Sequence, residues 1–376
     1  MIKSIWVDNF KSLVDFELKL AKFNCIVGLN GSGKSTVLQA LDFVSQLMIG
    51  DIDGWLKMRN WEKSDLNSKL TKKSNIDFRI VLEIEHKELV WTGSFNRSSL
   101  SCTKETITQN GEKILSVEDA VYSYHSIKHE IVFEYQGSIL SRLKENPHAH
   151  ILKVVKEKIL NIRSLDLISP ELLRSRNRSA EGKLGLGGEK LSAFVHESGM
   201  QTKDMLRREL IKVYPQLDEI KTKSLKSGWK QLEVTESFGN KKITSTARHV
   251  NDGMLRLMTI LLQLDIGKAF LLFDEIENGI NPELIEYLID HLINSDDQIL
   301  VTTHSPMILN FMDDDVAREG VIYLYKGKEG CTRAIKLFDI PSMAKKLNFM
   351  GPGEAFIDTD LTQLYLEIET LPTEDN

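Results

Sequence analysis

The sequence predicts an α/β protein whose central sheet has a parallel core. A glycine-rich turn, "GLNGSGKS" at 28–35, lies between an apolar strand pattern and an amphipathic helix pattern. Two further segments, "AFLLFDE" at 269–275 and "QILVTTHS" at 298–305, are unbroken apolar runs that end in polar residues. Such runs are typical of strands that are buried on both faces of a parallel sheet.

Length and composition fit a soluble globular protein. The chain has 376 residues, of which 41% are hydrophobic and 27% charged, enough for one large domain or two modest ones. Its formal net charge is −6, which excludes a global positive field that would attract nucleic acid or acidic lipid. Any contact with nucleic acid would therefore need a local basic patch.

Three cysteines, Cys25, Cys102 and Cys331, are odd in number and widely spaced. They fit neither a disulfide framework nor a zinc site, and they favour a reducing compartment. The first residues lack the apolar run of a signal peptide, and no later stretch approaches a membrane span. We expect a cytoplasmic protein without a membrane partner.

Hydrophobic periodicity predicts the other elements. In chain order they are strands over 2–8, 13–20 and 23–28, a helix over 34–48, strands over 77–86, 88–95 and 130–135, helices over 150–160 and 203–214, a meander over 217–225, 230–237 and 242–250, and a buried helix over 253–264. The sequence "QNGE" at 109–112 predicts a tight turn.

The turn at 28–35 satisfies the pattern G-x-x-x-x-G-K-[ST]. Glycines let backbone N–H groups approach a β-phosphate, and the helix that follows presents its positive end. Lys34 would neutralise the β- and γ-phosphates, and the Ser35 hydroxyl would ligate Mg²⁺. A chance match in an unrelated loop is the alternative, but the strand–turn–helix context favours a P-loop that binds ATP and Mg²⁺. Its predicted contact residues are Gly28, Asn30, Gly31, Ser32, Gly33, Lys34, Ser35 and Thr36.

Two acids end the apolar run at 269–273. Asp274 is predicted to hold Mg²⁺ through water, and Glu275 to orient or deprotonate the attacking water. The alternative is a buried strand with a solvated acidic cap. Next to a P-loop, two neighbouring acids at a strand end favour hydrolysis over binding alone, which predicts an ATPase.

His304 follows the next apolar strand pattern, about thirty residues later. A histidine after a strand is often structural. In this position, as a neutral or charged donor, it is predicted to sense or stabilise the γ-phosphate.

Five motifs in this order carry a family resemblance: "NFKSL", "GLNGSGKST", "NDGMLRL", "FLLFDE" and "TTHSP". They resemble the ABC-type ATPase heads of RecF, SMC and OLD proteins, and most closely the compact AAA-type ATP-binding proteins of bacterial defence operons. The resemblance runs from Met1 to about Asn310. It implies a P-loop NTPase fold with a mixed central sheet, an antiparallel β lobe and an inserted helical lobe.

The resemblance also implies a shared site. "VNDGM" stands where the family has its signature, which in one subunit meets the γ-phosphate held by the other. Asn251, Gly253 and Arg256 would then act across a homodimer that ATP closes. The sequence departs from the family pattern, since Asn251 replaces a serine and Met254 a glutamine; an asparagine can still cap the helix.

Two neighbouring motifs are less defined. Asn278 and Asn281 lie where the family's D-loop contacts the opposite subunit, although a helix that starts at Pro282 explains that segment equally well. For the Q-loop, Gln136 after a strand competes with the segment 165–176.

The expected domains follow the resemblance. Residues 1–310 form the ATPase head, within which 76–136 form the antiparallel lobe and 137–250 the helical lobe and meander. Residues 311–376 complete the head or contact a partner, and their acidic tail starts at Leu371.

Three functions remain open. The first is an ATP-gated switch that closes as a head-to-head dimer and controls a separately encoded effector, in phage defence by resemblance alone. The second is a slow or inactive ATP-bound scaffold for DNA, RNA or a protein. The third is an OLD-like nuclease that uses Asp358 and Asp360, although too few residues follow His304 for a full Toprim domain.

Weaker patterns leave partners undecided. Basic residues at Arg174, Arg176 and Arg178 form either a solvated face or a nucleic-acid contact. Trp55 and Trp61 either anchor a partner or pack inside the fold.

Overall fold

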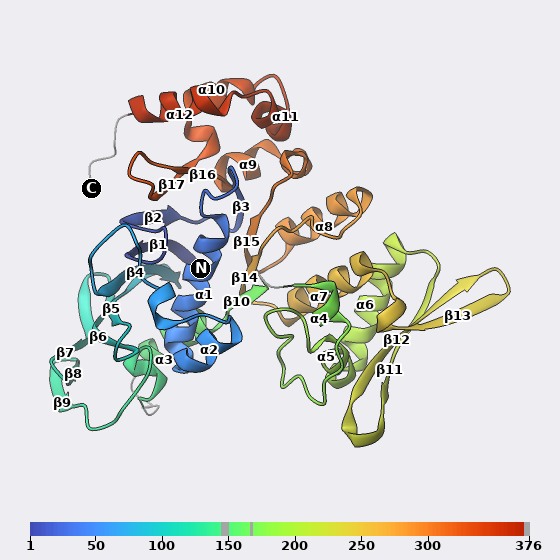
Figure 1. The fold of residues 1–376 in the computed structure, drawn as a ribbon, viewed down its shortest axis with the longest axis horizontal. Helices are drawn as coiled ribbons and strands as arrows, with labels where there is room; N and C mark the ends of the chain where they lie inside the picture. The colour runs from blue at the N-terminus through green and yellow to red at the C-terminus, as the bar shows by residue number, and fades with distance from the viewer. Residues whose placement is uncertain (144–149, 166–167, 372–376) are drawn as a thin grey trace. The chain divides into compact units, whose positions relative to one another are not determined.

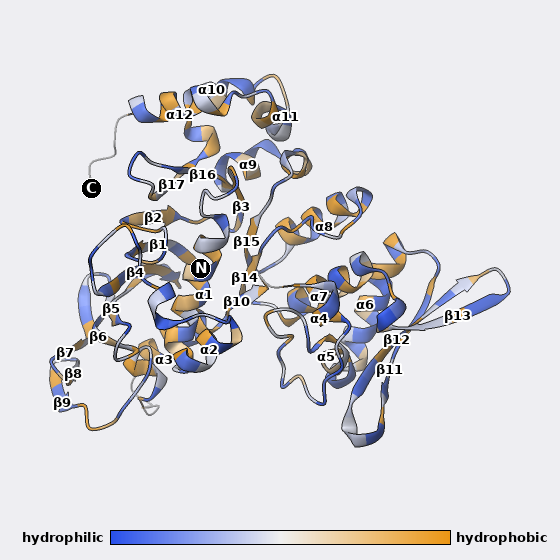
Figure 2. Cartoon of the chain, in the orientation of Figure 1, coloured by the Kyte–Doolittle hydropathy of each residue, from blue (hydrophilic) through white to orange (hydrophobic). Residues whose placement is uncertain are grey.

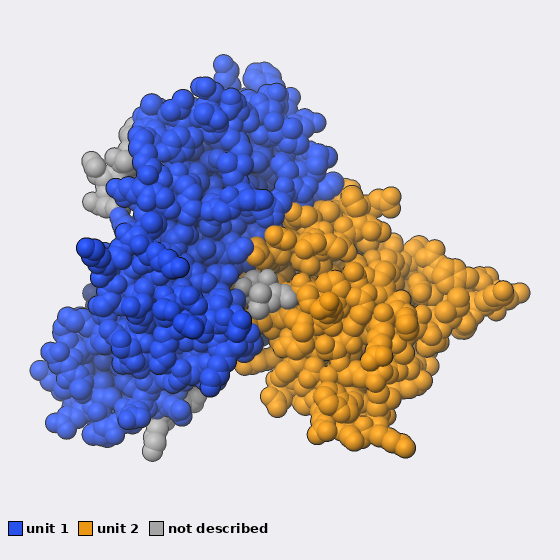
Figure 3. Space-filling view, viewed as in Figure 1, with its two compact units in different colours: residues 1–163, 298–376 blue, residues 164–297 orange. Residues whose placement is uncertain are grey.

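The computed structural model describes residues 1–143, 150–165 and 168–371, and these form two compact units (Figure 3). Unit 1 comprises residues 1–163 and 298–376, and unit 2 comprises residues 164–297. The boundaries between these units differ from the expected domain boundaries at 310 and within 76–250. The expected domains remain a prediction. The acidic tail beyond Leu371 lies outside the described residues.

The helices and strands follow the chain as Figure 1 labels them. Unit 1 contains β1 Ile2–Asp8, β2 Phe16–Lys19, β3 Phe23–Val27, α1 Lys34–Ile49, α2 Ile52–Met58, β4 Asn75–Ile84, β5 Lys87–Asn96, β6 Ser101–Gln109, β7 Glu112–Glu118, β8 Val121–Tyr124, β9 Ile127–Glu130, α3 His150–Leu160, β15 Gln298–Thr302, α9 Asp314–Gly320, β16 Val321–Lys326, β17 Thr332–Lys336, α10 Pro341–Lys346, α11 Pro352–Ile357 and α12 Leu361–Thr370. Unit 2 contains α4 Pro170–Leu173, α5 Leu191–Glu197, α6 Met200–Val213, β11 Leu217–Ser224, β12 Lys230–Phe238, β13 Lys241–Thr246, α7 Asp252–Ile266, β14 Phe270–Phe273 and α8 Pro282–Asn294, and β10 Ile162–Leu165 lies at the boundary.

The antiparallel lobe of unit 1 is an eight-stranded sheet with the order β2-β1-β4-β5-β6-β7-β8-β9. It therefore includes the two N-terminal strands in addition to the expected region. The predicted turn joins β6 to β7, where Asn110 and Gly111 have φ angles of 47° and 84°. Two successive positive φ angles match the twist of a tight hairpin, so this prediction is confirmed.

The strand predicted over 130–135 is wrong. The last strand of the sheet, β9, ends at Glu130, and the following residues are irregular. Val132 is 85% exposed, and the Tyr135 hydroxyl donates to the Cys102 carbonyl at 2.8 Å. β9 is the edge strand of the sheet, so, among the described residues, 131–135 have no strand beside which to pair. Of the alternating apolar residues there, Tyr135 contacts the sheet through its hydrogen bond to Cys102.

Helix α1 packs on the inner face of this sheet. The predicted apolar face, Val37, Leu41, Val44 and Met48, is buried along its whole length. Phe43, on the same helix, stacks on Phe10 with ring centroids 5.3 Å apart and meets Phe95 edge-on at 5.1 Å. Aromatic pairs at these separations add to the free energy of burial, so the helix that follows the P-loop is firmly anchored.

Four strands of unit 1 belong to the sheet that carries the P-loop. β15 and β16 both pair with β3 in parallel, and β17 pairs with β16 antiparallel. All five residues of β3 and all five of β15 are buried. The mixed sheet with a parallel core is therefore confirmed.

The last three helices cover β16 and β17 (Figure 1). Tyr323 on β16 meets Phe356 of α11 with ring centroids 6.1 Å apart, and Tyr325 meets Tyr365 of α12 at 5.9 Å. Lys328, in the turn after β16, forms an ion pair with Glu369 of α12. The C-terminal helices are thus fixed to the hairpin β16–β17.

Unit 2 contains the predicted three-stranded meander, in the order β11-β12-β13. Figure 2 shows β13 largely in hydrophilic colours, in agreement with its exposed residues. Helix α7 is the buried helix that the sequence predicts, since every residue from Met254 to Gln263 is buried.

Within unit 2, Glu209 of α6 is linked to α8. Its carboxylate accepts hydrogen bonds from Tyr287 at 2.7 Å and His291 at 3.0 Å, and it pairs with Lys212 at 2.7 Å. Burial alone would raise the pKa of Glu209, but the hydrogen bonds from Lys212, Tyr287 and His291 outweigh it and lower the pKa to about 2.

This lowered pKa predicts a pH dependence of stability. A carboxyl with a pKa below its unfolded value contributes stability above about pH 4.5, and the contribution is lost as the pH falls toward 2. We expect the free energy of unfolding, measured by urea denaturation, to fall between pH 5.5 and 4 by about 0.5 kcal/mol more in the wild type than in Glu209→Gln. Parallel curves for the two proteins would contradict this role of Glu209.

None of the helices in the described part of the chain is long and apolar enough to cross a membrane. Cys25, Cys102 and Cys331 are free thiols, and all three are buried.

Candidate nucleotide site

The P-loop joins β3 to α1 in unit 1. Gly28, Gly31 and Gly33 have φ angles of 151°, 79° and 111°, which other residues rarely adopt. A Cβ on Gly28 would lie 2.3 Å from the Leu324 carbonyl oxygen of β16, so the close approach of that strand also requires glycine. Asn30 and Gly31 are exposed at the tip of the loop, and Lys34, Ser35 and Thr36 form the first turn of α1.

Lys34 is buried against its own loop. Its ammonium group donates to the carbonyl oxygens of Gly28 at 2.8 Å and Leu29 at 3.3 Å. A lysine held inside the loop in this way places a positive charge where phosphate oxygens approach in a P-loop.

Two observations test whether this loop fits a nucleotide phosphate. Among the described residues, the buried hydroxyl oxygen of Ser32 finds no hydrogen-bond partner. Helix α1 starts at Lys34, its N-cap residue Gly33 provides no side-chain cap, and its first turn contains no acidic residue. Its N–H groups and positive end therefore face the loop without competition from an internal acceptor, so the residues fit a bound phosphate.

His304 lies at the same edge of the sheet as the P-loop. β15 is parallel to β3 and pairs with it up to Thr302 and Ile26, and the Thr303 N–H donates to the Ile26 carbonyl at 3.1 Å. His304 follows directly and is exposed to solvent. Unit 1 thus presents the P-loop and this histidine together.

Unit 2 carries the two predicted acids. β14 is buried along its length, and Asp274 and Glu275 follow it at partly exposed positions. Glu275 has a φ angle of 47°, which is uncommon for a residue with a side chain and is often found at functional sites.

Arg256 of α7 holds this turn. Arg256 is 7% exposed, and its guanidinium donates to the carbonyl oxygens of Asp274 at 3.2 Å and Glu275 at 2.9 Å. Burial lowers the pKa of Arg256, and Glu277 and Glu275 act in the opposite direction. The resemblance assigned Arg256 to a partner's phosphate, but in this structure it contacts the turn of its own chain, and no pattern in the sequence indicates that contact.

Of the two asparagines that the resemblance places in a D-loop, Asn278 has a local contact. Asn278 donates from its backbone N–H to the Glu275 carbonyl at 2.9 Å and from its amide to the Glu275 carboxylate at 3.3 Å. Asn281 is the exposed residue before α8, which begins at Pro282. Glu275 is therefore positioned by Asn278 and Arg256 together.

The signature segment starts helix α7, as expected. Asn251 caps the helix, because its side-chain oxygen accepts from the Met254 N–H at 2.7 Å. A Cβ on Gly253 would lie 3.1 Å from the Gly279 carbonyl oxygen, so the helix start approaches the turn before α8 closely. Arg174, which sequence placed in a basic cluster, donates to the Val250 carbonyl at 2.9 Å and forms an ion pair with Asp252.

Comparison with known proteins identifies the family. The family described as "AAA ATPase domain" matches residues 1–309. The chain belongs to this family. This AAA ATPase domain is 25% identical over 289 residues to the DNA double-strand break repair Rad50 ATPase of Methanococcus maripaludis, which covers 67% of this chain and 26% of the relative. It is 41% identical to the OLD nuclease of Thermus scotoductus over 61 residues, 16% of this chain and 10% of the relative.

The fold has a solved counterpart. The Smc head domain with an extended coiled coil, bound to the C-terminal domain of ScpA derived from Pyrococcus furiosus, matches 92% of this chain and 99% of its own with a TM-score of 0.52 and 14% identity. This match confirms the fold of an ABC-type ATPase head. The AAA ATPase domain spans about a quarter (26%) of its Rad50 relative and a tenth (10%) of its OLD relative.

Residues outside the ATPase motifs have mainly structural contacts. Asp358 pairs with Lys346 at 3.0 Å and Asp360 caps α12, and no cluster of three or more His, Cys, Asp or Glu side chains suited to a metal occurs within residues 1–143, 150–165 and 168–371. The nuclease interpretation therefore gains no support from this pair.

The remaining sequence candidates also have partners. Arg176 donates to Gln231 at 2.6 Å, and Arg178 lies over Trp229 at 5.3 Å. Trp55 is buried, and Trp61 meets it edge-on at 5.3 Å, which favours packing over partner binding.

The Q-loop candidates stay undecided. Gln136 exchanges hydrogen bonds with Asp53 and does not follow a strand directly, contrary to expectation. In the competing segment, Asp166 and Leu167 lie outside the described residues.

Proposed function

We propose that this chain is an ATP-driven switch that hydrolyses ATP when two copies engage head to head. The carrying observation is the P-loop, in which left-handed glycines, the buried Lys34 and an uncapped α1 form a cradle for phosphate. Gly28 to Thr36 would hold the triphosphate. Ser35 and Asp274 would each serve as a ligand of Mg²⁺, whose positive charge would stabilise the leaving phosphates.

Two residues carry the chemistry in this proposal. Glu275 accepts a proton from, or orients, the attacking water, and its arrangement by Arg256 and Asn278 supports that role. His304 donates a hydrogen bond near the γ-phosphate, in agreement with its position after a strand parallel to β3.

The second copy supplies the signature. Asn251 and Gly253 begin an α-helix, and a helix start attracts an anion. In the proposed dimer they contact the γ-phosphate held by the partner. The output passes to a separately encoded protein, and the SMC head solved with the C-terminal domain of ScpA supports an output of this kind. A defence setting rests on the resemblance to defence ATPases.

A slow, scaffold-like ATPase is the second candidate. The Asn251 side chain already accepts the Met254 N–H, so its oxygen serves the helix, and its contact with a partner's phosphate depends on the amide nitrogen alone. This arrangement favours slow turnover. Partner binding that persists in a Lys34→Ala variant would support the scaffold.

ATP turnover per chain, measured across a wide range of protein concentration, tests the switch. We expect turnover to rise with concentration and then saturate, because each site needs residues from two chains. Turnover that is constant at all concentrations, while light scattering shows a monomer, would contradict the shared site. An absence of turnover with intact ATP binding would favour the scaffold.

A further inference from the structure

A threonine far along the chain supports the P-loop from behind. Thr332 is the first residue of β17 and is fully buried, and its hydroxyl donates to the carbonyl oxygen of Ser32 at 2.8 Å. No sequence motif singles this threonine out, and it lies beyond the residues that match the family.

The hydroxyl of Thr332 uses its full hydrogen-bonding capacity. A hydroxyl has one donor and two acceptor positions. Since its proton goes to Ser32, the 2.8 Å contact with the Ser12 hydroxyl requires Ser12 to donate. Lys326 of β16 donates to the same oxygen at 3.1 Å. Replacement of this group would therefore leave three buried or half-buried polar groups without their partner.

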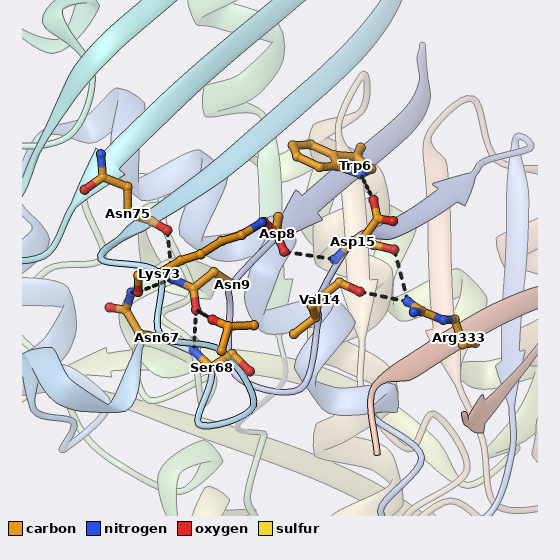
Figure 4. A network of polar contacts seen from close by, with 11 residues as sticks. Trp6, Asp8, Asn9, Val14, Asp15, Asn67, Ser68, Lys73, Asn75 and Arg333 are labelled. Atoms are coloured by element: carbon orange, nitrogen blue, oxygen red, sulfur yellow. Dashed lines mark hydrogen bonds and ion pairs between the residues drawn. The ribbon is translucent and has the colours of Figure 1, made fainter. Parts of the chain in front are cut away.

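The loop that carries Ser12 is itself fixed (Figure 4). Asn9 donates to the carbonyl oxygens of Lys73 at 2.8 Å and Asn75 at 2.7 Å. At the other end, Arg333, next to Thr332, donates to the Val14 carbonyl at 2.8 Å. The Thr332 N–H also donates to the Ser12 carbonyl at 3.0 Å. Ser12 and Thr332 are thus held together by their backbones as well as their side chains.

The bond to Ser32 sets the direction of a P-loop N–H. The Ser32 carbonyl and the Gly33 N–H belong to one planar trans peptide, in which the two groups point in opposite directions. When Thr332 holds the carbonyl, the Gly33 N–H points away from β17. A Cβ on Gly33 would lie 2.4 Å from the Thr332 hydroxyl oxygen, so this contact admits only glycine.

We propose that Thr332, supported by Ser12, is a positioning residue for nucleotide binding: it orients the Ser32–Gly33 peptide so that the Gly33 N–H faces the phosphate. This inference rests on the proposed function, because it assigns Thr332 to the same ATP site. Because the N–H group is oriented before the ligand binds, the free energy of binding does not include the entropic cost of ordering that peptide.

The test compares Thr332→Val with Thr332→Ser, using the full chain and a fluorescent ATP analogue with Mg²⁺. Valine keeps the shape and removes the hydroxyl, whereas serine keeps the hydroxyl. We expect Thr332→Val to bind the analogue about tenfold more weakly and Thr332→Ser to bind within about threefold of the wild type. Thr106→Val is the matched control, because Thr106 lies on β6 and its hydroxyl bonds to Thr92 instead; its affinity should not change.

Ser12→Ala provides a second route if Thr332→Val folds poorly. We expect a loss of about threefold, and no additional loss when Ser12→Ala is combined with Thr332→Val, since both act through one hydroxyl. A wild type that does not bind the analogue would overturn the proposed function. A wild type that binds it, with Thr332→Val equally tight or Thr332→Ser equally weak, would overturn the role of the Thr332 hydroxyl alone.

Discussion

Replacing Lys34 by alanine is expected to weaken ATP binding by about 100-fold. In the free loop the ammonium donates to the Gly28 and Leu29 carbonyls, and it is buried among P-loop atoms. In the proposed complex this charge contacts the β- and γ-phosphates, where hydrogen bonds between charged groups are stronger than neutral ones. Isothermal titration with ATP and Mg²⁺ measures the loss directly.

Lys22→Ala is the control for this change. Lys22 is an exposed lysine that precedes the same strand, β3, at the end opposite to the P-loop. The two variants remove the same charge, so unspecific attraction of ATP would weaken equally in both. We expect Lys22→Ala to bind like the wild type. Equal affinities in Lys34→Ala and the wild type would show that the nucleotide does not use this loop.

Replacing Glu275 by glutamine is expected to lower turnover by about 100-fold or more while ATP binding is retained. Glutamine keeps the size of the side chain but cannot accept a proton from the attacking water. Its amide can still meet Asn278, so the turn held by Arg256 should persist. Because hydrolysis reopens the proposed dimer, ATP should trap the variant as a dimer, which light scattering coupled to gel filtration detects.

Glu283→Gln is the matched control, since Glu283 is an exposed glutamate in the first turn of α8 in the same unit. Its turnover and its mass in ATP should equal those of the wild type. If Glu275→Gln hydrolysed ATP at the wild-type rate, another group would have to be the base. If Glu275→Gln lost turnover but stayed a monomer in ATP, the result would support the catalytic role of Glu275 and contradict the proposed dimer.

The sequence predicted the elements that hydrophobic patterning determines. We expected the buried faces of α1 and α7 and the apolar runs of β3, β14 and β15. Burial of one face of a helix, or of a whole strand, requires apolar residues at regular positions in the sequence. The P-loop was expected for a similar local reason, since close approach to phosphate demands glycines at fixed spacing. A motif of this kind can be predicted because all its residues are neighbours in the sequence.

The contacts that support the site could not be predicted in this way. Arg256 holds the turn after β14 from a neighbouring helix, and Thr332 holds Ser32 from a different strand. Neither residue type is unusual at its position, and the pairing exists only once the sheets are assembled. The stretch after Glu130 was wrongly predicted as a strand, because alternation of polar and apolar residues does not show whether a partner strand is present.

The support of the P-loop by Thr332 and Ser12 has a consequence for the biosynthesis of the protein. Ser12 and Thr332 are 320 residues apart, and the strands that flank β3 are β15 and β16. A ribosome must therefore translate 300 further residues after Ser32 before the P-loop acquires the hydrogen bond from Thr332. Because pairings between distant segments form late, the nascent protein should gain affinity for nucleotide in one late step, after the segment that contains Thr332 has been translated.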